Sequence, residues 1–185
     1  MGRRPTSNDD DGLHTRGSGN GGLRWIRDLE RPVVGEVPPS PGVYVVMKDG
    51  PNPPEILSRN PAGWFKERDP TASRTALEAA WVQGCTIVYI GKAARLRTRL
   101  RQYRDHGQGK PVGHWGGRYI WQLGGSGELR AAWKVTDENP RLLEQEMLAA
   151  FLEHYGQLPF ANLSAESPSN TAVIAGGSRR SAKRK

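Results

Sequence analysis

The chain has 185 residues, 36% of them hydrophobic, with 27 Lys or Arg against 19 Asp or Glu and a formal net charge of +8 at pH 7. This length fits one domain of ordinary size, and the single cysteine, Cys85, excludes a disulfide framework or a cysteine-ligated zinc site. No apolar run is long enough for a membrane span, and none follows the N-terminus as in a secretory signal, so we expect a cytoplasmic protein with no membrane partner.

Residues 1–39 predict an N-terminal arm that is largely disordered. Residues 1–22 are rich in Gly, Ser, Asn and Asp, so they carry too little apolar surface to fold alone. The apolar residues Leu23 and Trp25 predict a short helix near 23–30 that packs on the domain. Three prolines then set the chain into an extended entry.

Residues 40–164 predict the folded domain, and residues 165–185 predict a disordered basic tail. The expected strands are 43–47, 86–90, 118–123 and 129–135, and the expected helices are 75–82, 93–103 and 140–155. Gly91 is expected to end the second strand, and a glycine-rich hairpin over 124–127 is expected to join the last two. The larger elements predict an α+β domain with a small, mainly antiparallel sheet flanked by helices, in the order ββαββα.

One basic segment stands out within the domain. Residues 92–118 carry a net charge of +7, whereas the rest of residues 40–164 is net −3. Such a directed field suits a phosphate backbone, although a solvated charged helix face is the alternative. The cations expected to contact the backbone are Arg95, Arg97, Arg101, Arg104, Lys110 and Arg118.

The helix expected over 140–155 places a carboxylate on its apolar face. On a helical wheel, Glu144 falls inside the apolar face, between Phe151 and Leu148, whereas Glu146 falls on the opposite, wet side. Burying an unpaired charge is very costly. We therefore expect Glu144 to have a partner, either a buried Arg or Lys or a bound divalent cation.

The helix expected over 93–103 carries an arginine at the border of its apolar stripe. Tyr103 lies in the stripe, Arg101 lies about opposite, and Arg99 falls at the edge. A guanidinium held at such a border is suited to grip a phosphate. The alternatives for Arg99 are a snorkelling border residue and an ion pair with Glu144.

Several motifs in chain order resemble the GIY-YIG endonuclease superfamily. They are Gly42-Val43-Tyr44, Val88-Tyr89-Ile90-Gly91-Lys92-Ala93, Arg99, Tyr103, Glu144 and Pro159-x-x-Asn162. The stretch from Tyr89 to Tyr103 is similar, without a gap, to the GIY-YIG catalytic domain of the bacterial excision-repair nuclease. Each tyrosine alone is an ordinary strand residue and each tripeptide alone is common, but their ordered combination over residues 40–164 is specific.

The resemblance implies roles in phosphodiester hydrolysis. Tyr89 positions or deprotonates the attacking water beside Tyr44, and Lys92 helps to activate Tyr89. Arg99 holds the scissile phosphate, with support from Tyr103.

The resemblance also implies a metal site and a structural asparagine. Glu144 coordinates one Mg²⁺ or Mn²⁺ ion, and Asn162 fixes the local geometry. His114, in a Gly-rich loop, is a second acid–base candidate, because some restriction enzymes of the superfamily place a histidine near the site. Tyr44 and Tyr89 are farther apart in sequence than is usual there, so residues 51–84 are an insertion that we expect to shape the substrate site.

The sequence therefore predicts a divalent-metal-dependent DNA endonuclease of the GIY-YIG type that hydrolyses phosphodiester bonds. We expect DNA as its partner and no small-molecule cofactor, and we leave a homodimer open. One alternative is a catalytically inactive nucleic-acid-binding module of the same fold. Another is a purely structural domain with a core ion pair between Glu144 and Arg99.

Overall fold

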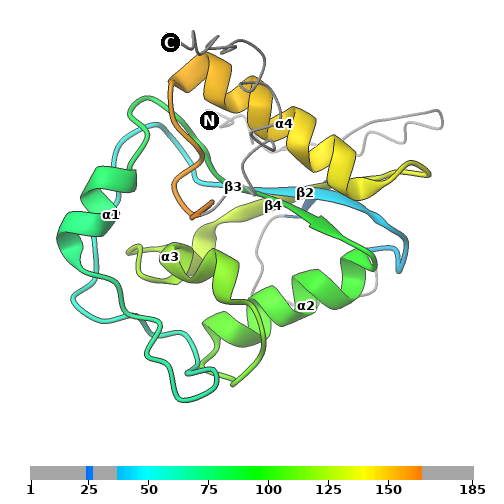
Figure 1. Cartoon of the computed structure of the whole chain (residues 1–185). Coiled ribbons are helices and arrows are strands. Elements are labelled where there is room, and N and C mark those ends of the chain that lie inside the picture. Colours follow the sequence, from blue (N-terminus) through cyan, green and yellow to red (C-terminus); the bar gives the residue numbers. More distant parts are fainter. Residues whose placement is uncertain (1–23, 27–36, 164–185) are drawn as a thin grey trace, which may run out of the picture.

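The computed structural model describes residues 24–26 and 37–163, and a four-stranded antiparallel sheet forms its centre (Figure 1). In the sheet order β1-β4-β2-β3, the strands are β1 (Arg24–Ile26), β4 (Arg130–Val135), β2 (Gly42–Met47) and β3 (Ile87–Ala93). The helices are α1 (Arg74–Ala80), α2 (Leu96–Gly107), α3 (Arg118–Trp121) and α4 (Pro140–Tyr155), with short 3-10 turns η2 (Trp115–Gly117) and η3 (Ser126–Glu128). The predicted α+β class, a small antiparallel sheet flanked by helices, is confirmed.

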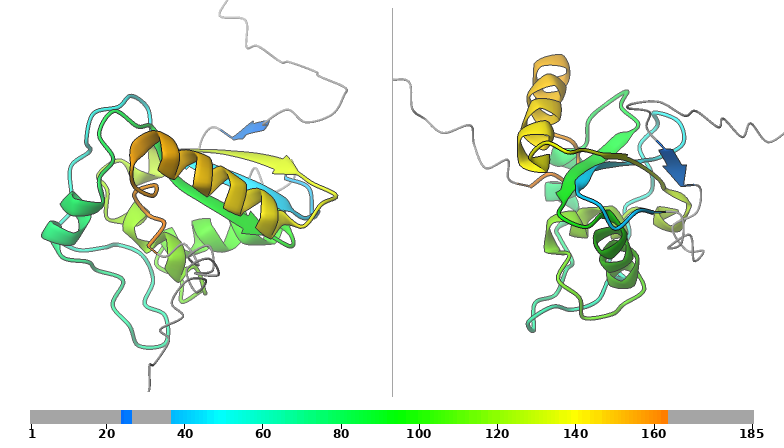
Figure 2. Two further views of the ribbon diagram at one scale, coloured as in Figure 1. Left: turned by 45° about the horizontal axis from the view of Figure 1, so that its top comes forward. Right: turned by 90° about the vertical axis from the view of Figure 1, so that its right-hand side faces the viewer.

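The sheet is covered on both faces, with α4 on one side and α2 and α3 on the other (Figures 1 and 2). The central strand β2 is an unbroken apolar run, which is typical of a strand buried on both faces. Tyr44 and Val46 belong to the core on the α2 side, which includes Leu96. Val45 points the other way and packs in the core with Phe151 of α4.

Helix α4 has the bounds that the sequence predicts, because both of its ends are capped. The Asn139 side chain accepts a hydrogen bond from the Arg141 N–H at 3.0 Å, and proline occupies the first turn. Gly156 takes the left-handed conformation, with φ of 73°, and its N–H donates to the Leu152 carbonyl at 2.8 Å.

The predicted strand over 118–123, with its hairpin, is wrong. This segment forms α3, and Ile120, Trp121, Gln122 and Leu123 are buried in succession rather than alternately. A half-buried strand buries every second residue, so the burial of four residues in a row does not fit the half-buried strand that the sequence predicts. The order ββαββα is therefore incorrect in its second half.

Three other boundaries differ from the prediction. The part of 23–30 that the structure describes is a strand, because β1 pairs with the free edge of β4. Strand β3 continues through Gly91 to Ala93, and α2 begins at Leu96 and ends at Gly107. The predictions of disorder for residues 1–22 and 165–185 lie outside the described residues.

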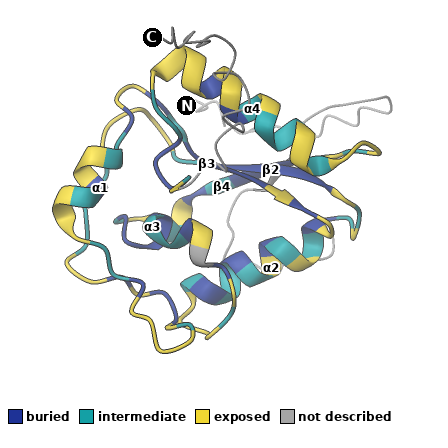
Figure 3. Cartoon of the chain, in the orientation of Figure 1, coloured by how far each residue is buried: buried dark blue, intermediate teal, exposed yellow. Residues whose placement is uncertain are grey.

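The insertion over 51–84 is tied to the domain by two buried amides. The Asn60 side chain donates to the Arg118 carbonyl at 2.7 Å, and the Gln122 side chain donates to the Leu57 carbonyl and accepts from the Ala72 N–H. Most of α1 and the outer surface of α4 remain exposed (Figure 3). Within the described residues, no helix is both long and apolar enough to cross a membrane.

Candidate active site

Two tyrosines lie side by side on the face of the sheet that α2 covers. Tyr44 of β2 stands opposite Gly91 of β3, and Val46 stands opposite Tyr89, so both tyrosine side chains project to the same side. Their ring centroids are 5.7 Å apart. A Cβ atom at Gly91 would lie 2.6 Å from Tyr89 Cε1 and 2.8 Å from Tyr44 Cζ. Glycine therefore stands at this position because the two rings occupy the space above it.

Arg99 of α2 reaches the two phenols. It is half-buried and donates a hydrogen bond from Nη1 to the Gly113 carbonyl at 3.2 Å. Burial acts to lower the pKa of Arg99, but the interactions with Tyr44 and Tyr89 raise it by more, so the pKa stays above its usual value. The guanidinium is thus a fixed charge beside two phenolic oxygens.

Burial favours the protonated form of Tyr44, in this cluster, and of Tyr103, next to it. Burial raises the pKa of Tyr44 well above its usual value, and neighbouring Tyr89 adds to the rise, while Arg99 offsets part of it. Burial also raises the pKa of Tyr103, whose hydroxyl has no hydrogen-bond partner among the described residues. Both phenols therefore keep their protons at neutral pH.

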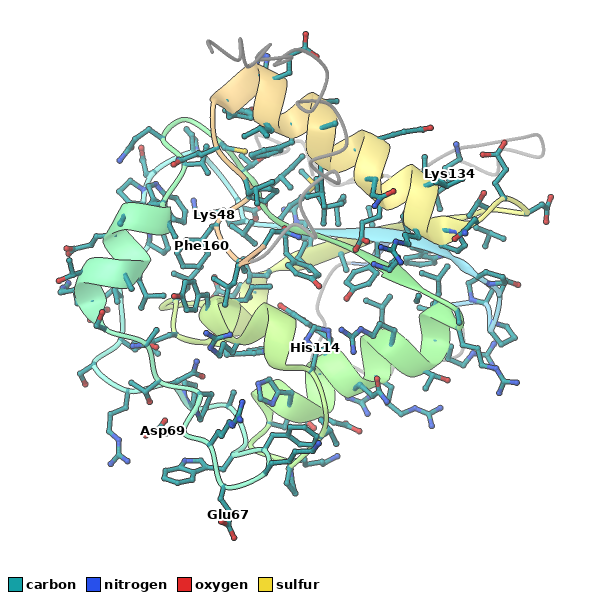
Figure 4. The ribbon with its side chains drawn as sticks, in the orientation of Figure 1. Lys48, Glu67, Asp69, His114, Lys134 and Phe160 are labelled. Carbon is teal, nitrogen blue, oxygen red and sulfur yellow. The ribbon has the colours of Figure 1, made fainter. Side chains whose placement is uncertain are left out.

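His114 joins the cluster from the loop that follows α2 and lies between the sheet and that helix (Figure 4). It is fully buried, its Nε2 atom lies 3.3 Å from the Tyr44 hydroxyl, and its ring packs edge-on against Tyr103 at a centroid distance of 5.2 Å. Burial, reinforced by the charge of Arg99, lowers the pKa of His114 to about 3. An imidazole that is neutral throughout the physiological range argues against the predicted acid–base role and favours a hydrogen-bonding one.

Glu144 and Lys92 pair on the other face of the sheet, under α4. Lys92 Nζ donates a short hydrogen bond to Glu144 Oε2, and the Glu144 side chain is only 12% exposed. Glu146 is exposed, as the wheel predicts. The cation that compensates the charge of Glu144 is therefore Lys92 and not Arg99. The cation next to the two phenols is Arg99, and not Lys92 as the resemblance implies.

Glu144 is the carboxylate that this site offers to a metal ion. Among the described residues, no group of three or more His, Cys, Asp or Glu side chains is placed to hold a metal. Mg²⁺ is commonly held by one or two carboxylates, with waters and substrate phosphates completing its shell. Glu144 alone fits such an ion only when a phosphate-bearing substrate supplies further oxygen ligands.

A groove of about 680 Å³ runs between the start of α4, the end of β3 and α2. Four basic residues are among those that line it, Lys92, Arg95, Arg99 and Arg141. Sequence reasoning missed Arg141. Its signal was available, because a cation in the first turn of a helix opposes the helix dipole and so indicates a role other than helix stability.

Asn162 completes β3 at the edge of the sheet. Its side chain accepts from the Ile90 N–H at 3.0 Å and donates to the Ile90 carbonyl at 2.7 Å. The Ala161 N–H donates to the Val88 carbonyl at 2.9 Å. This segment thus takes the place of a missing neighbouring strand and holds β3, and with it Tyr89, in position.

The six cations predicted to contact DNA differ in their exposure and in how far they already interact with other groups of the protein. Arg95 and Arg101 are exposed at α2, whereas Arg97 donates from Nε to the Val37 carbonyl at 2.7 Å. Arg118 is half-buried beside the ring of Tyr119.

Arg104 and Lys110 are partners of one carboxylate. Arg104 lies 2.8 Å and Lys110 lies 3.1 Å from Asp105 Oδ1. Their charge is therefore partly neutralised within the protein, and Arg95 and Arg101 are the cations of this set that are best presented to a ligand.

Comparisons with protein-family models, with curated proteins and with solved structures found no significant match to this chain.

Proposed function

We propose that the protein is a divalent-metal-dependent endonuclease that hydrolyses phosphodiester bonds in DNA. The observation that carries the proposal is the position of Arg99, half-buried beside Tyr44 and Tyr89 and in the lining of a groove that three other basic residues also line. A guanidinium presented in this way suits the grip of a phosphate far better than a mobile surface arginine does. The motif order that resembles the GIY-YIG superfamily points to the same chemistry.

The chain's own residues divide the work in this proposal. Arg99 binds a non-bridging oxygen of the scissile phosphate and neutralises its developing charge. Tyr89, less buried than Tyr44, orients the attacking water through its hydroxyl. The water oxygen bonds to phosphorus as one ester P–O bond breaks; the water gives a proton to solvent, and the departing ester oxygen takes a proton from solvent to leave as a hydroxyl group. Arg95 and Arg141, along the groove, bind the flanking phosphates.

Glu144 is the protein ligand proposed for Mg²⁺ or Mn²⁺. When bound, such an ion neutralises charge on the phosphoryl group and stabilises the leaving oxygen. Lys92 holds the Glu144 carboxylate next to the groove that Lys92 itself lines.

The test is cleavage of supercoiled plasmid with Mg²⁺, with Mn²⁺ and with EDTA. The wild type is expected to nick the plasmid only with metal, and Arg99→Ala and Glu144→Gln are expected to lose at least about 10²-fold in rate. Matched controls are Arg74→Ala, on exposed α1, and Glu146→Ala, on the exposed side of α4. Both are expected to keep cleaving.

The outcomes separate the candidate functions. Salt-sensitive binding of DNA without cleavage of plasmid, branched or damaged substrates would favour the inactive binding module. A wild type that neither binds nor cuts DNA, while Glu144→Gln is strongly destabilised, would favour the structural domain. Loss of cleavage in Glu146→Ala but not in Glu144→Gln would refute the assignment of the metal ligand.

A further inference from the structure

A segment of five residues between α2 and α3, Gly113–Gly117, lies against three side chains of the candidate site. The Gly113 carbonyl accepts from Arg99 Nη1 at 3.2 Å, and the His114 ring lies 3.3 Å from the Tyr44 hydroxyl. At Gly116, a Cβ atom would lie 3.6 Å from the Tyr89 hydroxyl. One short segment thus borders the arginine and both tyrosines.

We propose that the segment Gly113–Gly117 is the positioning element of the candidate site, and that His114 acts in it as a neutral hydrogen-bond partner of Tyr44. Through His114 and the Gly113 carbonyl, the segment holds Tyr44 and Arg99 in one arrangement, so that the guanidinium meets the phosphate without reorganising. This proposal rests on the proposed function, because it assigns a role in the same site.

The segment has the packing that a positioning element needs. The His114 ring packs edge-on against Tyr103, at a centroid distance of 5.2 Å, and lies nearly parallel to the ring of His106, at 6.4 Å. At Gly117, a Cβ atom would lie 2.9 Å from His114 Cε1. The imidazole is therefore confined on several sides, and its burial keeps it uncharged next to Arg99.

The insertion over 51–84 supports the same segment from outside. A Cβ atom at Gly113 would lie 3.4 Å from Phe65, and the Gly63 N–H donates to the His106 carbonyl at 2.8 Å. A Cβ atom at Gly63 would lie 2.1 Å from the Lys110 carbonyl oxygen, so the two loops are in backbone contact. The insertion thus buttresses the segment that borders the site.

The test compares a rescuing variant with a disabling variant on the DNA substrate that the wild type cuts. Glutamine places an amide group near the position of the imidazole Nε2, so His114→Gln is expected to keep kcat within about threefold of the wild type. His114→Leu is expected to lower kcat by about 10²-fold with little change in KM. Gly117→Ala, which displaces the imidazole without removing it, is expected to resemble His114→Leu and serves as the second variant if His114→Leu does not fold.

Two readouts separate positioning from other roles. The first is the pH profile of kcat, which is expected to be the same in the wild type and in His114→Gln. If His114→Gln and His114→Leu both lose activity, and one limb of the wild-type pH profile disappears in His114→Gln, the proposal is overturned in favour of acid–base catalysis. Full activity of His114→Leu and Gly117→Ala would overturn it as well.

The second readout does not depend on cleavage. Nitrogen-15 relaxation of the Arg99 guanidinium is expected to report an ordered side chain in the wild type and in His114→Gln and a disordered one in His114→Leu. If the wild type cuts no substrate but this ordering depends on His114, the proposed function fails while the positioning role stands. An Arg99 that is equally ordered in all three proteins refutes the positioning role.

Discussion

At the residue scale, the candidate site depends on the absence of a side chain at Gly91 as well as on the side chains around it. Gly91 lies opposite Tyr44, within the strand that carries Tyr89, and its absent Cβ leaves room for both rings. The sequence suggested that this glycine ends a strand. In the structure, glycine is needed at this position because the side chains of Tyr44 and Tyr89 lie directly over it.

Gly91→Ala tests this explanation. The added methyl group would meet two confined rings at 2.6 and 2.8 Å, so we expect the free energy of unfolding to fall by about 1–3 kcal/mol through overpacking. Gly116→Ala is the matched control, because its Cβ would make only an ordinary contact at 3.6 Å. Urea denaturation of both variants measures the difference, and equal stabilities would contradict the argument.

The buried histidine predicts a pH dependence of stability. Because burial lowers the pKa of His114 to about 3, from 6.5 for the free side chain, the unfolded chain binds more protons than the folded one between these values. Stability is therefore fully present above pH 6.5 and falls as the pH is lowered towards 3. The slope from one such histidine is at most about 1.4 kcal/mol per pH unit, and burial lowers the pKa of His106 in the same direction.

Urea denaturation at pH 7, 6 and 5 measures this slope. His114→Gln, which removes the titrating group, is expected to be less sensitive to pH than the wild type. His154→Gln, at an exposed position of α4, is expected to retain the wild-type slope. An unchanged slope in His114→Gln would show that His114 is not buried as a neutral group.

At the element scale, the edge strand β3 is held by a side chain rather than by another strand. Asn162 makes both backbone hydrogen bonds of Ile90 that a neighbouring strand would make. The sequence drew attention to Asn162 only through a motif. The structure gives the physical reason for an asparagine, since its amide group carries one donor and one acceptor at the spacing of a peptide group.

Asn162→Ala is expected to leave two polar groups of Ile90 without their partner. We expect a loss of about 1–3 kcal/mol in the free energy of unfolding and faster hydrogen exchange of the Ile90 amide. Asn52→Ala, at an exposed position of the insertion, is the control and is expected to change neither. Unchanged exchange at Ile90 in Asn162→Ala would contradict the role of Asn162.

At the scale of the whole molecule, the net charge of +8 is spread unevenly. The basic segment 92–118 includes α2, but three of its cations are engaged within the protein, Arg97 with a carbonyl and Arg104 and Lys110 with Asp105. The charge that this segment presents outward is therefore smaller than the count, and Lys92, Arg95 and Arg99 of the segment line the groove.

Salt dependence of DNA binding tests this distribution. Each phosphate contact contributes about 0.9 to the slope of log K against log salt concentration. Arg101→Ala is expected to lower the slope by about that amount, whereas Arg74→Ala, on exposed α1 and paired with Glu78, is expected to leave it unchanged. Fluorescence anisotropy with a short duplex in EDTA gives both slopes. Equal loss in the two variants would show that binding follows total charge rather than the α2 surface.

The sequence by itself determined the elements whose signals are local. The caps at Asn139 and Gly156, the apolar stripe of α2, the unbroken apolar run of β2 and the inward side of Glu144 depend on spacing within one element, and all are found in the structure. Only the tertiary structure decided the rest. The segment 118–123 contains the helical turn α3, in and after which four successive residues are buried, β1 pairs with the free edge of β4, and Glu144 of α4 pairs with Lys92 of β3. His114 reaches Tyr44, 70 positions away in the chain, because a buried hydrogen bond depends on how distant segments pack and leaves no periodic trace in either segment.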